Sequence, residues 1–201
     1  MAMPPAHRIA RHNYPIRSAA FAYTLVVMVA TWIEAGRVGV PEVLLAIGCF
    51  LVYPQLAYLY ARVAVHSKRA ELNNLYADCL LLGMWVAHLQ FALWPGVMLL
   101  GALCLNAAGH GHLERLLRSL ALFAAGTALW SASFESGFKP ESGPLVSSAS
   151  AFGILAYASA VGSLVFLQNK HLLHAWDTVH NSETQFRFVA DRVGEMVAVL
   201  D

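Results

Sequence analysis

The fold is decided by residues 40–60, VPEVLLAIGCFLVYPQLAYLY, in which Glu42 is the one charged side chain. A run of this length and apolar character is typical of a transmembrane helix, which needs about 20 such residues. The rest of the chain has a similar character, because 58% of its 201 residues are hydrophobic and 12% are charged. A soluble domain carries about 25% charged residues. The composition therefore predicts an integral membrane protein and leaves no room for a soluble catalytic domain.

Six apolar stretches along the chain are each interpreted as one membrane helix. They cover residues 19–33, 40–60, 76–94, 97–109, 116–134 and 145–167. The sequence therefore predicts an all-α integral membrane bundle of about six transmembrane helices. The stretch 97–109 spans only roughly 20 Å at 1.5 Å per residue, whereas the hydrocarbon core is about 30 Å thick. It either crosses with the help of flanking residues or local thinning of the bilayer, or it is re-entrant.

The basic residues orient these helices. In an in–out alternation, one side of the membrane receives eleven of the 13 Lys and Arg residues, and the other side receives Arg37 and Lys139. Because cytoplasmic loops are enriched in Lys and Arg, this bias predicts that both termini lie in the cytoplasm. It also favours a full crossing by residues 97–109, since otherwise Arg115 and Arg118 would lie outside.

Two further expectations concern the ends and the interior of the helices. Trp94-Pro95-Gly96 is predicted to form a tight outer turn between the third and fourth helices, and Trp32, Trp94 and Trp130 are predicted to anchor the outer interface. Pro54 is expected to kink the second helix.

An acidic and polar stripe opens the third helix. Glu71, Asn74 and Asp78 lie at positions i, i+3 and i+7, and Trp85 follows seven residues later on the same face. Ionisable groups near hydrocarbon normally face the bundle interior and have partners, and Arg62 is the expected partner. The stripe is either a polar hinge that transmits or binds a signal at the cytoplasmic boundary, or a structural clamp for the loop 61–76.

A second polar set lies deeper in the predicted bundle. His88 and Gln90 belong to the third helix and Asn106 to the fourth. Together they are expected to form a small polar pocket between facing helices. Such a pocket is either a ligand site or a set of interhelical hydrogen bonds that needs no ligand.

No motif predicts catalysis, and no catalytic residue is assigned. The sequence contains no glycine-rich phosphate loop, nucleophile elbow or H-E-x-x-H motif. Cys49, Cys79 and Cys104 form no C-x-x-C pair, and no histidine spacing demands a metal. We therefore expect no metal and no cofactor. The net charge of +1 does not predict a nucleic-acid partner.

Several short motifs occur in one ordered pattern over roughly residues 50–120. They are Tyr53-Pro54-Gln55-Leu56-Ala57-Tyr58, Glu71…Asn74-Leu75…Asp78, Gly83-Met84-Trp85-Val86, Pro95 and Leu105-Asn106. This pattern resembles the second type of membrane-associated sensor domain, a bacterial integral-membrane input module. The first motif of that family usually reads Trp-Pro-His-Leu-Ala, so Tyr53 and Gln55 depart from it and the family's histidine is missing here.

The resemblance implies a multi-pass protein of the bacterial inner membrane that serves as the sensory head of a signalling protein. The output of such proteins is most often a diguanylate cyclase, which makes cyclic-di-GMP, and sometimes an adenylate cyclase or a histidine kinase. The family supplies no generally established ligand, so the signal is left as an unknown small molecule or membrane state.

The end of the chain fits such a module. From Val165 to Val189 apolar residues recur in an approximate heptad, which Gln168 and Ser182 interrupt. We expect a cytoplasmic N-terminal tail at 1–18, the six-helix sensor domain at 19–167 and a signalling helix at 168–189 that pairs with a second copy. Residues 190–201 look like the truncated start of a PAS domain.

The sequence thus predicts a sensory and anchoring module. Its expected partners are the lipid bilayer and a second copy of the chain, through the membrane helices and the C-terminal helix. Two alternatives stay open. A small transporter or channel would use the scattered polar residues together with the helix break at Pro54, and a passive anchor would only dimerise an output domain.

Overall fold

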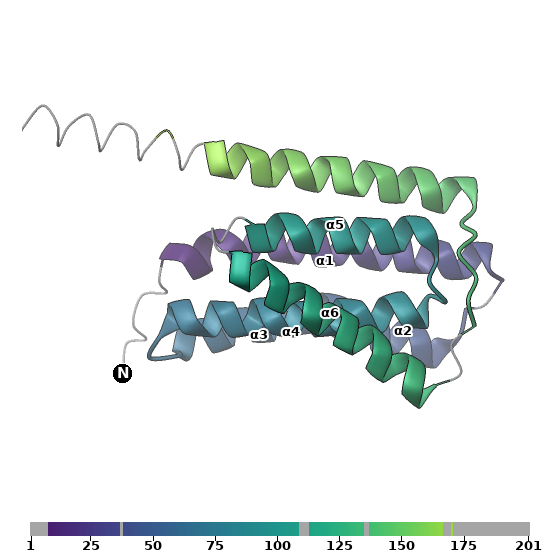
Figure 1. The fold of residues 1–201 in the computed structure, drawn as a ribbon, viewed down its shortest axis with the longest axis horizontal. Coiled ribbons are helices and arrows are strands. Elements are labelled where there is room, and N and C mark those ends of the chain that lie inside the picture. Colours follow the sequence, from purple (N-terminus) through teal and green to yellow (C-terminus); the bar gives the residue numbers. More distant parts are fainter. Residues whose placement is uncertain (1–7, 37, 109–112, 135–136, 167–169, 171–201) are drawn as a thin grey trace, which may run out of the picture. The chain divides into compact units, whose positions relative to one another are not determined.

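The computed structural model describes residues 8–36, 38–108, 113–134, 137–166 and 170. The secondary structure of this part is helical and contains no strand (Figure 1). The elements are α1 (Arg8–Glu34), α2 (Val40–Ile47), the π-helical turn η1 (Gly48–Val52), α3 (Tyr53–Val63), α4 (Ser67–His88), α5 (Leu93–Ala108), α6 (Leu113–Ser133) and a last helix over Pro144–Phe166. Residues up to Val161 form one unit, whose packing is described below, and those from Gly162 form another.

The expected signalling helix at 168–189 and the expected PAS-like segment at 190–201 lie outside the described residues, apart from Lys170.

Among the described residues, four helices are long and apolar enough to cross a membrane. They span Tyr14–Glu34, Val40–Val63, Leu113–Ser133 and Pro144–Phe166. The apolar helix α5 has 16 residues, or roughly 24 Å, and is shorter than these four. The prediction of an all-helical, multi-pass membrane protein is confirmed at this level.

The surface of the spanning helices suits a lipid environment. Large apolar side chains that include Leu44, Leu51, Leu117 and Leu155 are exposed along them. In water, exposed apolar surface on this scale would promote association, whereas hydrocarbon chains are as apolar as these side chains. Helix α4 is different, because it buries Glu71, Asn74 and Asp78 among its neighbours.

The second membrane segment stays helical across its proline. The backbone N–H of Tyr53 donates to the carbonyl of Gly48, five residues back, so the helix widens by one π-type turn before Pro54. Pro54 has no N–H, and its ring would collide with the carbonyl four residues earlier in a regular α-helix. The wider turn relieves this conflict and places Pro54 in the first turn of α3, where it is buried.

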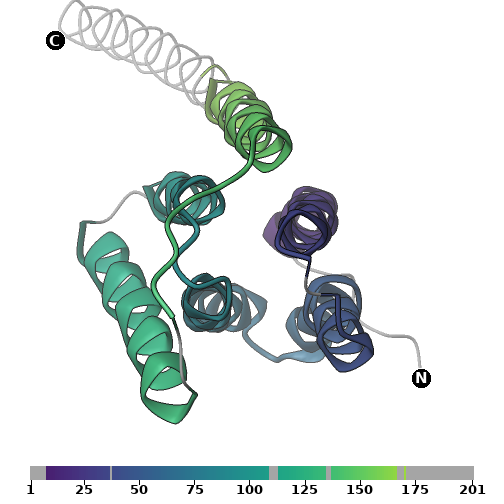
Figure 2. The ribbon, with the colours of Figure 1, turned by 90° about the vertical axis from the view of Figure 1, so that its right-hand side faces the viewer.

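Helix α4 occupies the middle of the first unit. Figure 2 shows it between α6 on one side and α2 and α3 on the other, and it also contacts α1 and α5. A methyl group at Gly83 would overlap the carbonyl of Phe123, and one at Gly126 would overlap the carbonyl of Leu80. The Thr127 hydroxyl donates to the Gly83 carbonyl at 3.1 Å. Glycine at both crossing points therefore brings the backbones of α4 and α6 into contact.

The turn between the third and fourth helices differs from the prediction. The chain reverses at Leu89–Ala92, where Gln90 and Phe91 have φ angles of 56° and 61°, and not at Trp94-Pro95-Gly96. Residues 94–96 instead lie in the first turn of α5. A proline fits there because the first N–H groups of a helix have no intrahelical acceptor.

The segment before the last helix forms hydrogen bonds with this turn, and the first turn of the last helix forms hydrogen bonds with α1. The Lys139 N–H donates to the Gln90 carbonyl at 2.8 Å, and the Leu93 N–H donates to the Pro140 carbonyl at 3.0 Å. At the start of the last helix, the N–H groups of Leu145 and Val146 donate to Glu34 Oε1 at 3.2 and 3.3 Å. A carboxylate at a helix N-terminus satisfies free N–H groups and the helix dipole.

Candidate functional site

The polar stripe of α4 is buried and meets one arginine. Arg17 Nε donates to Asp78 Oδ2 at 3.0 Å, and Arg17 Nη1 donates to Glu71 Oε2 at 3.3 Å. The side chains of Arg17, Glu71 and Asp78 are 9%, 3% and 7% exposed. One guanidinium therefore serves two carboxylates in a site that is nearly closed to its surroundings.

The prediction of Arg62 as the partner is wrong, because Arg17 pairs with both Glu71 and Asp78. Helices α3 and α4 pack antiparallel. Their register sets Tyr53 beside Asp78 and Ala57 beside Asn74. In this register Arg62 lies opposite Arg69, about two and a half turns from Asp78, and no ion pair within the described residues joins it to either carboxylate. Arg17 reaches both carboxylates from α1 instead, and α1 is helical from Arg8, well before the apolar stretch that begins at residue 19.

Sequence reasoning missed Arg17, because it was assigned to the N-terminal tail. A usable signal exists: Glu71 and Asp78 both need a counter-charge, and Arg17 is the basic residue next to the first apolar stretch. Pairing the acidic residues of one apolar helix with the basic residues at the edge of another would have found it.

Two more side chains complete the cluster. The Tyr53 hydroxyl donates to Asp78 Oδ1 at 2.8 Å, and Asn74 Nδ2 donates to the Ala57 carbonyl at 2.9 Å. Each carboxylate oxygen of Asp78 thus has its own donor. The cluster links α1, α3 and α4 through hydrogen bonds that are directional and shielded, and such bonds fix one relative arrangement of the helices.

Replacing Tyr53 with phenylalanine tests this link. We expect Tyr53→Phe to lower the free energy of unfolding by about 1–2 kcal/mol, because Asp78 loses a buried donor and keeps its charge. Unfolding in mixed detergent micelles, followed by circular dichroism, measures the change. Tyr60→Phe is the matched control, since the exposed Tyr60 hydroxyl only accepts a 3.5 Å bond from Asn73. Equal losses in the two variants would contradict the role of Tyr53.

The other residues of the first motif join α1 to α3 or face outward. Tyr58 stacks on Tyr14 with ring centroids 4.3 Å apart, and the Tyr14 hydroxyl donates to Gln55 Oε1. Ala57 is buried, whereas Leu56 is 57% exposed. The motif therefore presents alternate faces to the bundle and to the surrounding lipid.

An aromatic cluster surrounds His88 at the other end of α4. The imidazole lies edge-on to three indole rings, with centroid distances of 5.0 Å to Trp85, 5.1 Å to Trp130 and 6.0 Å to Trp32. Trp85 also contacts Phe50 at 5.1 Å. Trp32 is buried, so its predicted role as an interfacial anchor is wrong: it packs into the bundle against Trp85 and His88.

The predicted polar pocket of His88, Gln90 and Asn106 does not assemble. Gln90 lies in the turn that follows α4, and its amide lies close to Gly137. Asn106 lies in the last turn of α5, roughly 20 Å along the helix axis from this turn. The two ends of α5 are too far apart for these side chains to meet.

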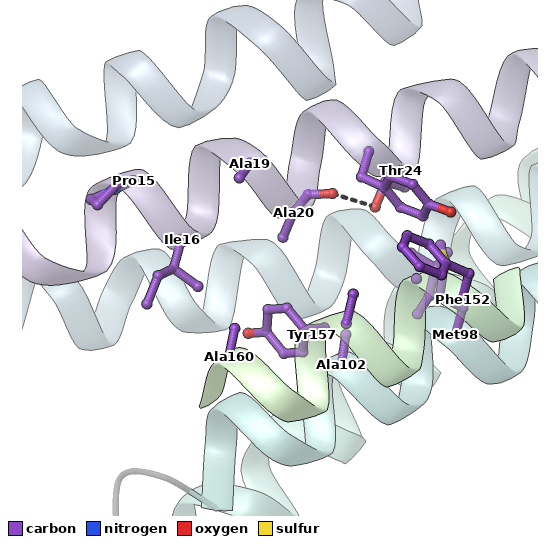
Figure 3. Close-up of a pocket in the computed structure, with 14 residues that line it drawn as sticks. Pro15, Ile16, Ala19, Ala20, Thr24, Met98, Ala102, Phe152, Tyr157 and Ala160 are labelled. Carbon is purple, nitrogen blue, oxygen red and sulfur yellow. Dashed lines mark hydrogen bonds between the residues drawn. The ribbon is translucent and has the colours of Figure 1, made fainter. Parts of the chain in front are cut away.

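A cavity of about 460 Å³ opens between α1, α5 and the last helix (Figure 3). Small side chains line much of it, from Ala19 and Ala20 on α1, Ala102 on α5, and Ala156 and Ala160 on the last helix. Aromatic rings of Phe152 and Tyr157 also face it. The alanines of the last helix thus border open space, whereas Gly153 packs against Tyr23 and Met98.

The described residues contain no group of three His, Cys, Asp or Glu side chains that could hold a metal ion. Cys49, Cys79 and Cys104 are free thiols. The arrangement of Arg17, Glu71 and Asp78 can hold α1 and α4 together.

These features define the class of protein: a multi-pass helical membrane domain with a buried charged cluster between α1, α3 and α4. Residues 12–101 match the model of the MASE2 domain family. The resemblance inferred from the motifs is thereby confirmed, and it fits a membrane sensory module of a signalling protein.

Two relatives are named probable diguanylate cyclase DgcC, one from Escherichia coli strain K12 and one from Escherichia coli O6:H1. Each is 34% identical to this chain over 79 residues, which are 39% of this chain and 21% of the relative. The chain thus covers about a fifth of the length of these relatives. No solved structure matches the chain.

Proposed function

We propose that this chain is the membrane sensory module of a bacterial signalling protein and passes a signal to a cytoplasmic output domain. The observation that carries the proposal is the MASE2 match over residues 12–101, together with a relative named as a probable diguanylate cyclase. Diguanylate cyclase activity, and so cyclic-di-GMP signalling, is the output we propose. Catalysis itself is assigned to the output domain, because no catalytic motif occurs in these residues.

The proposed topology has six crossings in the inner membrane, with both termini in the cytoplasm. Four candidate spans, together with the hairpin of α4 and α5, supply the six helices. Arg17 belongs to the buried cluster and no longer counts as a loop residue. The remaining basic residues still favour one side by ten to two, which supports the same orientation.

The proposed mechanism divides the bundle into a fixed part and a movable part. Arg17, Tyr53 and Asp78 clamp α1, α3 and α4 together. On the other face of α1, a cavity leaves α5 and the last helix less tightly packed. A signal would change how α5 and the last helix pack against the helices around α4, and the last helix would carry this change toward the cytoplasm. Such a switch requires a ligand with different affinities for the two states.

The polar groups favour this function over a transporter or channel. Glu71 and Asp78 each bond to Arg17, and Asn74 bonds to a backbone carbonyl. A conduction path needs polar groups that face a continuous water-filled route. A closed cluster is better suited to holding helices in register.

We also propose that the module acts as a homodimer. Apolar side chains are exposed on the spanning helices, and α6 exposes Ala124, Ala125 and Ala128, which let a second helix approach closely. Pairing through residues 168–189 would align two output domains. The bilayer and a second copy of the chain are thus its proposed partners.

A fusion to a diguanylate cyclase catalytic domain tests the function. We expect Trp85→Ala in this fusion to change cyclic-di-GMP production about fivefold, because a shift of about 1 kcal/mol between two bundle states changes their ratio by that factor. Trp85 contacts three aromatic rings in the core, which makes it sensitive to packing. Production in isolated membranes is the measurement, with equal amounts of inserted protein.

Trp94→Ala is the matched control, because Trp94 is 43% exposed, and it should leave production unchanged. In a second fusion, an unrelated dimeric anchor replaces residues 1–165. This fusion should lose the regulation of cyclic-di-GMP production. If cyclic-di-GMP production in this second fusion is regulated as before, the alternative function of a passive anchor is correct. If both tryptophan variants match the unchanged fusion, Trp85 has no part in signalling.

A further inference from the structure

The cavity between α1, α5 and the last helix has the properties of a binding site for an amphiphile. Its volume of about 460 Å³ lies within the range of small-molecule sites, about 300–1,000 Å³. The lining residues run from Pro15 to Thr24 along α1, a length of roughly 14 Å. The cavity is therefore long enough for part of an extended hydrocarbon chain, and small apolar side chains border it.

The hydroxyl groups that line the cavity differ in whether they already have a hydrogen-bond acceptor. The Tyr23 hydroxyl donates to the Ala149 carbonyl at 2.7 Å, and the Thr24 hydroxyl donates to the Ala20 carbonyl at 2.9 Å. Both donors are therefore used within the protein. The Tyr157 hydroxyl makes no hydrogen bond within the described part of the chain, and Figure 3 shows it at the end of the cavity near Ile16 and Ala160.

Charge reinforces this difference between the two ends. Arg17 and Asp78 lie near enough to act electrostatically on the Tyr157 hydroxyl, although Arg17 itself points to α4. The end near Thr24 has only satisfied hydroxyls and apolar walls, with Met98 and Phe152 beside it. The cavity thus has one polar end and one apolar end.

We propose that this cavity binds one hydrocarbon chain with a hydrogen-bond-accepting oxygen head group. The Tyr157 hydroxyl donates to the head, and the chain extends past Ala20 and Ala102 toward Thr24. Its walls belong to candidate membrane spans and to the apolar α5, so the ligand enters from the bilayer. Ala156 and Ala160 are exposed and give it access. A free fatty acid and the acyl ester of a phospholipid share this chemistry.

The inference rests on the proposed function only where the ligand is taken as a signal. Binding is measured on the purified chain and needs no output domain. The site can therefore fail while the signalling fusion succeeds, and the reverse is equally observable.

The experiment places the purified chain in phosphatidylcholine nanodiscs with one of two photoactivatable probes, a diazirine palmitic acid or a diazirine phosphatidylcholine. We expect saturable labelling of the α5 peptide that contains Met98 and Leu99, because both line the cavity and are hardly exposed elsewhere. Labelling by the fatty acid identifies a free acid as the ligand, and labelling by the phospholipid identifies an acyl ester.

Three variants locate the site. Ala102→Trp fills the middle of the cavity, and Ala160→Trp blocks its edge, so each should lower labelling at least tenfold. Tyr157→Phe should raise the probe concentration at half-saturation about fivefold, which is the effect of one lost hydrogen bond. Leu155→Trp lies on the same helix, 68% exposed, and should change nothing. Labelling that does not saturate, or that is equal in Ala160→Trp and Leu155→Trp, would overturn the proposal in favour of ordinary boundary lipid.

Discussion

Replacing Arg17 with alanine is expected to lower the free energy of unfolding by about 3–5 kcal/mol, the largest single effect in the molecule. The variant leaves Glu71 and Asp78 buried without their shared counter-charge, and both carboxylates are almost closed to their surroundings. Because removing charges from water is unfavourable, a buried carboxylate without a partner is far more destabilising than an exposed one. Unfolding in mixed detergent micelles, followed by circular dichroism, measures the loss.

Two further variants test whether this loss comes from the buried charges. Arg118 pairs with Glu114 one turn away on α6, with side chains 62% and 72% exposed, so Arg118→Ala should change stability by less than about 0.5 kcal/mol. The triple variant with Arg17→Met, Glu71→Gln and Asp78→Asn should recover part of the loss, because it removes all three charges together. If Arg17→Ala behaves like Arg118→Ala, the cluster does not hold the bundle.

The second large effect is expected from Gly83→Ala, which should lower the free energy of unfolding by about 1–3 kcal/mol. The new methyl group would overlap the Phe123 carbonyl, which is backbone and cannot turn aside. The helices α4 and α6 would have to separate, and the 3.1 Å bond from Thr127 to the Gly83 carbonyl would lengthen. The same unfolding assay measures this change.

Gly48→Ala is the matched control, because a methyl group at Gly48 meets no atom within 4 Å. There the substitution should be neutral or stabilising, since alanine restricts the unfolded chain more than glycine does. Gly126→Ala should resemble Gly83→Ala, as it would meet the Leu80 carbonyl in the same helix pair. Equal stability of Gly83→Ala and Gly48→Ala would rule out a close α4–α6 contact.

These two contacts bear on signalling in different ways. The ion cluster holds α1 and α3 to one side of α4, and the glycine contact holds α6 to another. Both fix α4, so movement in the proposed sensor is left to α5 and the last helix, beside the cavity. In the cyclase fusion, a variant that filled the cavity would then change output without the loss of stability expected for Arg17→Ala.

The fold class could be predicted because apolar length and composition reflect the solvent in which the helices lie. The stretches 40–60, 116–134 and 145–167 correspond to spans at Val40–Val63, Leu113–Ser133 and Pro144–Phe166. The turn after α4 was misplaced, because Trp94-Pro95-Gly96 has typical turn residues and Gln90 and Phe91 do not. Non-glycine residues at positive φ are stabilised here by contacts with residues 137–140, distant in sequence.

The candidate site could be predicted in part. The spacing of Glu71, Asn74 and Asp78 correctly places them on one helix face, because helical periodicity is a local property. Their partner could not be found in this way, since Arg17 comes from another helix and depends on how α1, α3 and α4 pack. For the same reason Trp32 looked like an interfacial residue but lies in the core beside His88.

Composition and short motifs were thus enough to predict a helical membrane domain that resembles the MASE2 family, whose model matches residues 12–101. Hydrophobic length and helix period are local properties and require no knowledge of neighbouring helices. The choice of Arg17 over Arg62, the glycine contact of α4 with α6, and the cavity ending at Tyr157 came only from the packed structure. Each of these brings together side chains that are far apart in the chain. Their distances depend on helix register and crossing, which the packing of the whole bundle sets.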